Sequence, residues 1–209
     1  MYVCQWPDSE RFICKCRIDN YRGAQFFVNE TNACHLDDPL PCYLGFGRTI
    51  AGRNGSFVIA SPISGLLGSV VTQGTVFTYT GPLTSGQVID IRAAVQNLQA
   101  TSLWDMNSAS FDQLGFRMID GEDVRIISVP GSDGKRGKLV FVPSSGLPRG
   151  NVDVMLVTQF TLTGVEQGGL FSHALARAED GSILVSARGF RNTGNGGEFY
   201  YIPTGAILF

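Results

Sequence analysis

Apolar and polar residues alternate along the chain from Asn151 to Thr163, and this alternation is the clearest pattern in the sequence. One set of alternate positions, interrupted only by Thr158, consists of Val152, Val154, Leu156, Phe160 and Leu162. A period of two is typical of a β-strand, because successive side chains point to opposite faces. The pattern predicts one long central strand, or two strands joined by a bulge near Thr158, in a mostly antiparallel β domain.

Short apolar segments separated by glycine, proline and other turn residues extend this β pattern through most of the chain. Turn sequences that suit paired strands occur at Asn54-Gly55, Gln73-Gly74, Asp120-Gly121 and Glu179-Asp180-Gly181. A last pair of strands, 198–202 and 206–209, is expected around Pro203. Such spacing is typical of an antiparallel β-sandwich or barrel, of which the jelly roll is one form, with at most one or two short helices.

Residues 87–106 fit two periodicities. Apolar residues recur at helical spacing at Val88, Ile91, Val95 and Leu98. Thr84 or Ser85 could cap the start of such a helix. Residues 89–92 also alternate as a strand does, so the sequence favours a short helix here and leaves a strand as the alternative.

Residues 1–48 differ in composition from the rest of the chain, because they hold every cysteine and His35, one of the two histidines. The cysteines are Cys4, Cys14, Cys16, Cys34 and Cys42. Within this part, 11–18 and 24–28 are expected to pair as strands. We therefore expect a cysteine-containing N-terminal extension or small subdomain at 1–48, followed by a main β domain at 49–209.

The cysteine cluster allows three interpretations. The residues could be reduced cysteines that pack as small apolar side chains. Two disulfides would pair four of them and leave one free, which requires an oxidising compartment. In the third interpretation a structural zinc site uses Cys14, Cys16, Cys34 and Cys42, with His35 as a further candidate. The Cys-x-Cys spacing is tighter than that of most zinc ligands, and no other cofactor is expected.

Charged residues make up only 16% of the chain, compared with about 25% in typical soluble domains. A soluble monomer usually exposes more charge. Part of this surface is therefore expected to be buried against copies of the chain or other proteins, unless Ser, Thr, Asn and Gln cover it instead. The net charge is −2, and no basic run exceeds Lys135-Arg136 with Lys138 beside it, so a nucleic-acid partner is not expected.

No apolar segment approaches the roughly 20 residues of a membrane-spanning helix, so no membrane partner is expected. Residues 1–10 lack the basic start and the apolar run of a secretory signal. The chain is therefore expected to be made in the cytoplasm, from where it can enter an assembled particle such as a virion.

Motifs typical of zinc proteases, serine hydrolases and phosphate-binding loops are absent from the sequence. Ser172, His173 and Asp180 have the residue types of a hydrolytic triad. Adjacent residues of a strand point to opposite faces, however, so Ser172 and His173 are poorly placed to meet. A catalytic cysteine is disfavoured too, because His173 would have to serve it from the far end of the chain.

The acidic turn that contains Asp120, Glu122 and Asp123 is a second enzymatic candidate. Paired carboxylates there could hydrolyse a glycoside, or bind Ca²⁺ weakly. The same residues fit a solvated hairpin turn better, so the sequence predicts no enzyme. Aromatic residues that could stack on a sugar, although they suit a core or an interface better, are Phe26, Phe27, Trp104, Tyr200 and Tyr201.

The sequence as a whole favours a non-enzymatic structural or assembly protein: a virion component associated with a capsid or tail, or an appendage component. The grounds are low charge, glycine-separated strands, an apolar C-terminal segment at Ile207-Leu208-Phe209 and the lack of a catalytic motif. Such a protein would contact copies of itself and other structural proteins, with loops 131–137 and 191–197 reaching neighbours. A carbohydrate-binding β-sandwich module is the second alternative, and a β-sandwich hydrolase is the third.

Overall fold

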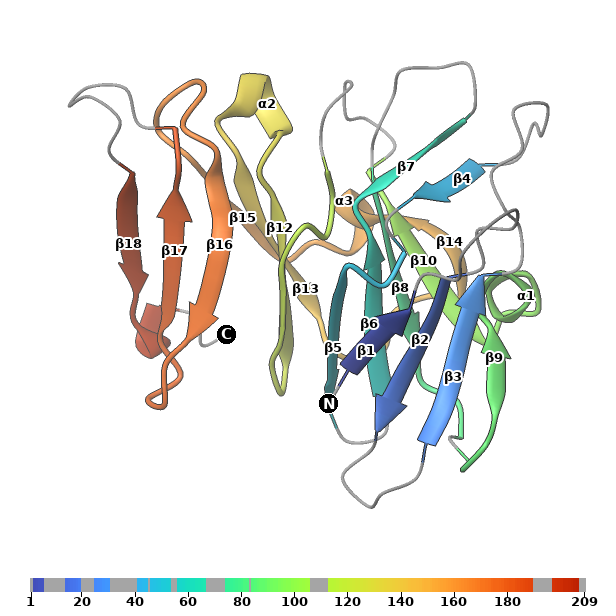
Figure 1. The fold of residues 1–209 in the computed structure, drawn as a ribbon. Coiled ribbons are helices and arrows are strands. Elements are labelled where there is room, and N and C mark those ends of the chain that lie inside the picture. The colour runs from blue at the N-terminus through green and yellow to red at the C-terminus, as the bar shows by residue number, and fades with distance from the viewer. Residues whose placement is uncertain are drawn as a thin grey trace.

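The structure is a computed structural model that describes the side chains of 46–52, 56–62, 74–82, 84–105, 113–189 and 197–206. Only the backbone is described for β1 (Tyr2–Gln5), β2 (Cys14–Asp19), β3 (Gln25–Glu30), β4 (Pro41–Leu44) and β7 (Ile63–Leu66). Strands dominate these residues and most of their pairings are antiparallel, which confirms the predicted fold class (Figure 1).

Three sheets form the main part of the described structure. The first has five strands in the order β14 (Gly150–Asp153), β10 (Ala100–Trp104), β8 (Thr75–Tyr79), β6 (Ser56–Ser61) and β5 (Thr49–Arg53). The second has four, in the order β11 (Met118–Asp120), β12 (Val124–Val129), β13 (Lys138–Pro143) and β15 (Phe160–Thr163). The third contains β16 (Phe171–Arg177), β17 (Ile183–Ala187) and β18 (Glu198–Ile202).

The four-stranded sheet is the middle layer of a face-to-face stack (Figure 1). Along β12, Ile127 and Val129 face the five-stranded sheet, while Ile126 faces the three-stranded sheet. Along β13, Val140 and Phe141 divide in the same way. Because both faces are covered, these strands carry nearly continuous apolar runs instead of an alternating pattern. The stack resembles a β-sandwich with an added layer, and no closed barrel forms among the described residues.

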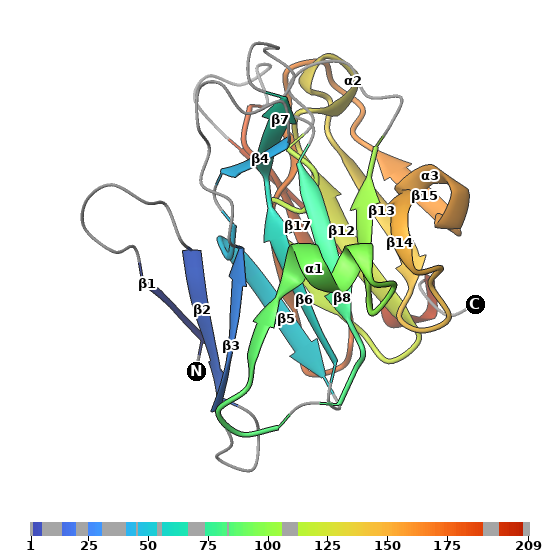
Figure 2. The same ribbon diagram turned by 90° about the vertical axis from the view of Figure 1, so that its right-hand side faces the viewer.

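A third core lies on the other face of the five-stranded sheet, where β9 (Val88–Asp90) and α1 (Ile91–Gln96) cover β6 and β8 (Figure 2). The rings of Phe57 and Tyr79 stack there with their centres 5.2 Å apart. The five-stranded sheet is therefore buried on both faces too.

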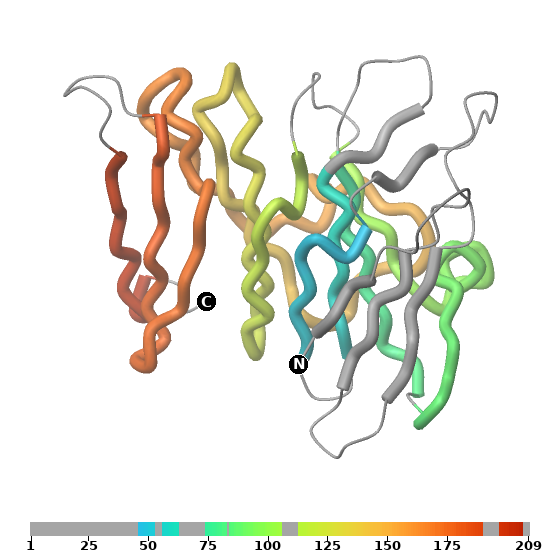
Figure 3. The backbone as a smooth tube through the Cα atoms, viewed as in Figure 1, coloured from blue at the N-terminus to red at the C-terminus, as the bar shows by residue number. Residues whose placement is uncertain are grey.

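The prediction of one long strand over 151–163 is wrong, and so is the alternative of a bulge at Thr158. The segment contains β14, then the helical turn α3 (Val154–Val157), then β15, and the two strands belong to different sheets (Figure 3). The Asp153 carboxylate accepts the Met155 N–H at 3.0 Å, and the Thr158 hydroxyl donates to the Val154 carbonyl at 2.7 Å. These two polar side chains close the turn that carries the chain from the first sheet to the second.

Residues 87–106 contain both structures that the sequence allowed, because strand β9 leads directly into helix α1. The predicted caps, Thr84 and Ser85, are wrong: the Asp90 carboxylate caps the helix by accepting the Ala93 N–H at 3.1 Å. The predicted apolar face is only half right, since Val88 and Leu98 are exposed. The buried face consists of Ile91, Ala94 and Val95.

Three of the four predicted turns connect antiparallel strands. Arg53 pairs with Ser56 across Asn54-Gly55, which themselves lie outside the described residues. Asp120-Gly121 joins β11 to β12, and Glu179-Asp180-Gly181 joins β16 to β17. The partner strand predicted before Gln73-Gly74 lies outside the described residues, as do 191–196.

Two other details of the prediction need correction. Ala206 belongs to the short 3₁₀ helix η1 (Thr204–Ala206) instead of beginning a strand, and residues 207–209 lie outside the described residues. With α2 (Ser132–Lys135), the described residues contain three short α-helical segments, one more than expected. None of their helices has the length and apolar character needed to cross a bilayer.

The N-terminal strands form a sheet in the order β1-β2-β3-β9, and β4 pairs with β7. The pairing of β2 with β3 confirms the expected N-terminal pair. Because β9 lies within 49–209, the parallel pairing of β3 with β9 links the two predicted parts of the chain. The boundary at residue 48 stays a prediction.

Substitutions in α3 distinguish a helical turn from a continuous strand. Val154 is fully buried between the first two sheets, whereas Leu156 is 82% exposed. Val154→Ala is expected to lower the free energy of unfolding by about 1–3 kcal/mol, because it leaves a cavity between packed sheets. Leu156→Ala is expected to change it by less than about 0.5 kcal/mol. Denaturant titration measures both, and equal losses would support the continuous strand.

Candidate functional site

The outer face of the three-stranded sheet exposes three large apolar side chains, Leu184, Phe199 and Tyr201. It is formed by Ala174, Ala176, Leu184, Ser186, Phe199 and Tyr201, and we call these six residues the outer face. Strand register places Ala176, Leu184 and Tyr201 in one row across the sheet, and Ser186 beside Phe199 in the next. Phe199 is 79% exposed, Tyr201 59% and Leu184 42%.

The outer face has the composition of a covered surface. The opposite face of the same strands packs into the core through Leu175, Val185 and Tyr200. An antiparallel sheet with one face in water normally places polar residues on that face. None of the six outer-face residues is charged, and large apolar side chains occur in both rows. Contiguous exposed apolar patches of this kind mark interaction surfaces.

The turn between β16 and β17 forms a hydrogen bond with Tyr201, at the edge of the outer face. The Asp180 carboxylate accepts the Ser182 N–H at 2.9 Å and the Tyr201 hydroxyl at 3.3 Å. Hydrogen bonds from Ser182, and then from Tyr201, lower the pKa of Asp180. The Thr204 hydroxyl donates to the Asp180 carbonyl at 2.6 Å. This turn therefore fixes the Tyr201 ring at the end of its row.

The structure does not bring Ser172, His173 and Asp180 together as a triad. Ser172 is fully buried, and its hydroxyl donates to the Lys138 carbonyl at 2.8 Å. Asp180 is occupied in its turn, and the His173 ring lies beside Phe116 with the two ring centres 5.3 Å apart. No hydrogen bond joins Ser172 to His173 in the described part of the chain. Ser172 lies in an irregular part of β16 and has a φ of 70°, so regular strand alternation is not the reason for this separation.

The acidic turn is divided between a buried and an exposed part. Asp120 forms a cross-strand ion pair with Arg125 at 2.8 Å, and both side chains are at most 5% exposed. The second oxygen of this carboxylate, Oδ2, is buried without a hydrogen-bond partner. Glu122 and Asp123 are exposed on the turn. The gap beside the ion pair, lined in part by Val58, is too narrow for a ligand, so Asp120 acts as a structural residue.

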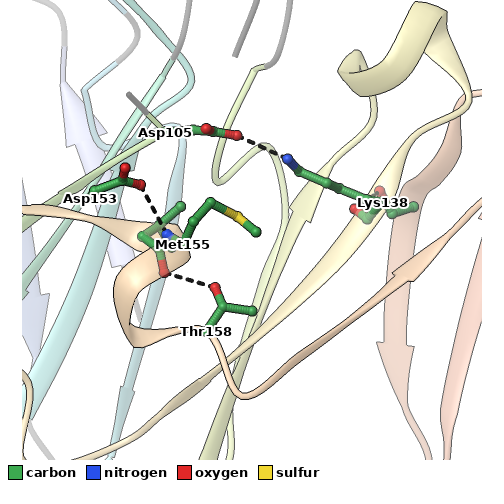
Figure 4. A network of polar contacts seen from close by, with 7 residues as sticks. Asp105, Lys138, Asp153, Met155 and Thr158 are labelled. Atoms are coloured by element: carbon green, nitrogen blue, oxygen red, sulfur yellow. Dashed lines mark hydrogen bonds and ion pairs between the residues drawn. The ribbon is translucent and has the colours of Figure 1, made fainter. Parts of the chain in front are cut away.

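A second ion pair connects the first two sheets near α3 (Figure 4). The Lys138 ammonium at the start of β13 lies 2.9 Å from the carboxylate of Asp105, which follows β10. The Asp105 side chain is 3% exposed. The sequence did not single out this pair, because the two residues lie far apart in the chain and only the stacking of the sheets brings them together.

The predicted cysteine ligands are placed by backbone only. Cys14 and Cys16 occupy alternate positions of β2, and Cys42 lies on β4, which belongs to another sheet. Register places Cys4 opposite Cys16 on the neighbouring strands β1 and β2. Cys34 lies outside the described residues. Reduced thiols, disulfides and structural zinc all stay predictions, and the described side chains elsewhere contain no cluster of potential metal ligands.

The predicted sugar-stacking aromatics do not form one surface. Tyr201 is exposed, but Tyr200 faces the core, where its ring meets Phe171 edge-on at 5.3 Å. Trp104 is partly buried and donates its indole N–H to Ser102. Phe26 and Phe27 lie on β3, whose backbone alone is described. Phe199 was missed, although alternation along β18 places it on the same face as Tyr201.

No protein-family model matches the chain, and a search of curated proteins found no match either. The contacts and exposed surfaces described above are therefore the grounds for any functional assignment.

The buried ion pair of the acidic turn can be tested by mutation. Arg125→Met is expected to lower the free energy of unfolding by about 3–5 kcal/mol, because it leaves the Asp120 carboxylate buried without its partner. Replacing both residues, as Asp120→Leu with Arg125→Met, is expected to recover most of that loss. The exposed Asp123→Asn serves as the control and is expected to cost less than about 0.5 kcal/mol. A double-mutant cycle in denaturant that shows no coupling would contradict a structural role.

The titration of His173 gives a second test. Partial burial lowers its pKa below the ordinary value of 6.5, and the positive charges of Arg188 and Arg117 lower it further. The folded state therefore takes up a proton less readily than the unfolded state. The free energy of unfolding should fall as the pH drops below about 6.5, and less so in His173→Asn. NMR titration checks the pKa, with His173→Asn separating this signal from that of His35, and a pKa at or above 6.5 would contradict the prediction.

Proposed function

We propose that this chain is a non-enzymatic structural protein that assembles with copies of itself and with other structural proteins. A virion, at its capsid or tail, or a related appendage is the setting that fits such a role. The observation that carries the proposal is the outer face, with its two rows of uncharged residues. Burial of a large apolar side chain contributes about 1.5–3 kcal/mol, so Leu184, Phe199 and Tyr201 together form a strong potential contact.

The edge of the same sheet supports self-association. Among the described strands, β18 pairs only with β17, so its other side presents unpaired backbone groups. Exposed edges of this kind readily pair with another chain. Two copies related by a twofold axis could pair β18 with β18 and join their outer faces into one continuous apolar surface. A second copy is therefore the partner that satisfies both the edge and the face.

Carbohydrate binding is the second candidate, favoured by one observation. Phe199 and Tyr201 project from the same face of β18, and residues two apart on a strand are separated by about 6.6 Å. Exposed rings at this spacing can stack on the apolar faces of sugars. The hydrolase alternative gains no such support, since Asp120 is tied to Arg125.

Sedimentation velocity over a wide concentration range tests self-assembly. The wild-type chain is expected to self-associate. The double variant Phe199→Ser with Tyr201→Ser is expected to have an association constant lower by at least about tenfold, or 1.4 kcal/mol. Leu156→Ser is the matched control, because Leu156 is equally exposed but lies in α3. A wild-type chain that remains monomeric at every concentration would contradict the proposal. A glycan array probed with the same variants tests the second candidate.

A further inference from the structure

Three basic side chains lie around Phe116, which comes just before β11 of the second sheet, and a fourth acts on one of these three. The guanidinium carbons of Arg117 and Arg48 lie 4.6 and 5.2 Å from the centre of the Phe116 ring. The His173 ring centre lies 5.3 Å from it. Arg188 is close enough to His173 to lower its pKa. We call Arg48, Arg117, His173 and Arg188 the basic cluster.

The basic cluster is assembled from four distant parts of the chain. Arg48 precedes β5 of the first sheet, and Arg117 precedes β11 of the second. His173 lies on β16 and Arg188 follows β17, both in the third sheet. The arrangement is therefore a product of the stacking of the sheets and not of a local run of basic residues.

Backbone contacts hold the centre of the cluster in place. The Phe116 carbonyl accepts the Thr49 hydroxyl at 2.7 Å and an Arg117 guanidinium N–H at 3.0 Å. The Arg117 N–H donates to the Ser128 hydroxyl at 2.7 Å, and the Ser128 N–H donates to the Arg117 carbonyl at 2.9 Å. Phe116 and Arg117 are thus fixed to both β5 and β12, which preorganises the cluster.

No carboxylate neutralises the cluster among the described residues. Arg125 and Arg136 elsewhere pair with Asp120 and Asp133, but Arg48, Arg117 and Arg188 form no ion pair with another described residue. Both charges that act on the His173 pKa are positive. Like charges held close together repel, and the protein as a whole is slightly acidic. The cluster is therefore a local concentration of positive charge that no carboxylate of the described residues pairs.

We propose that the basic cluster binds an oxyanion: a phosphate, sulfate or carboxylate group of a ligand. Guanidinium groups donate paired hydrogen bonds that match the oxygens of such groups. Cation–π contacts with the Phe116 ring hold the Arg48 and Arg117 guanidinium groups near each other, which favours joint binding of one anion. The site is separate from the outer face, so it does not depend on the assembly proposal.

NMR titration of the full chain with inorganic phosphate, sulfate and acetate, each at constant ionic strength, tests this site. The His173 ring signal should move saturably, with a Kd of about 1 mM for the favoured anion. The pKa of His173 should rise, because a bound anion offsets the repulsion from Arg188 and Arg117. A stronger response to phosphate and sulfate than to acetate assigns a tetrahedral anion, and the reverse assigns a carboxylate.

Variants that remove one positive charge distinguish anion binding at the basic cluster from non-specific screening of charge by salt. Arg48→Gln and Arg117→Gln are each expected to weaken binding by at least about tenfold. Arg177→Gln is the matched control, because it removes the same charge at the far end of β16 from His173. Arg48 is exposed, so the thermal midpoint of Arg48→Gln should match that of the wild type. Equal, unsaturable shifts with all three anions, or equal weakening by Arg177→Gln, would overturn the proposal.

Discussion

The burial of both faces of β12 and β13, the central strands of the middle sheet, is the constraint on which the rest of the structure depends. β12 and β13 must supply apolar side chains to two cores at once, and they do so residue by residue. A polar group in such a layer has no access to water and must find a partner within the protein. The Ser128 hydroxyl, which accepts the Arg117 N–H, and Asp120 Oδ1, which pairs with Arg125, meet that requirement, whereas Asp120 Oδ2 does not.

The same stacking explains why the outer face is unusual. The first two sheets are covered on both faces, and their apolar content follows from that. Among the described residues the third sheet is covered on one face only, yet Phe199 and Leu184 give its other face the apolar character of an inner layer. The apolar face at the end of the stack can be buried against one more layer. In a homo-oligomer a second copy of the chain supplies that layer. This links the proposed assembly to the architecture and not to a single residue.

Local signals allowed much of the fold to be predicted, but not the changes of sheet. Turn sequences such as Asp120-Gly121 act over a few residues, and the hairpins they predict are present. The alternation through 151–163 predicted a continuous strand because the sequence pattern continues across α3. In a strand Val154 and Leu156 would share one face, but in α3 Val154 is buried and Leu156 is exposed. Periodicity shows that side chains alternate, but it carries no information about which sheet a strand joins. The basic cluster was unpredictable for the same reason, since its members come from four separate segments.

The distribution of charge argues that the basic cluster is a site and not an accident of composition. The chain has 18 acidic and 16 basic residues other than histidine, so carboxylates are not in short supply. Where charges are buried, the fold pairs them: Asp120 with Arg125, and Asp105 with Lys138 across two sheets. Around Phe116 the stacking brings cations together, and no carboxylate of the described residues forms an ion pair with their guanidinium groups. The oxyanion of a ligand would gain the most favourable electrostatic energy when bound beside these arginines.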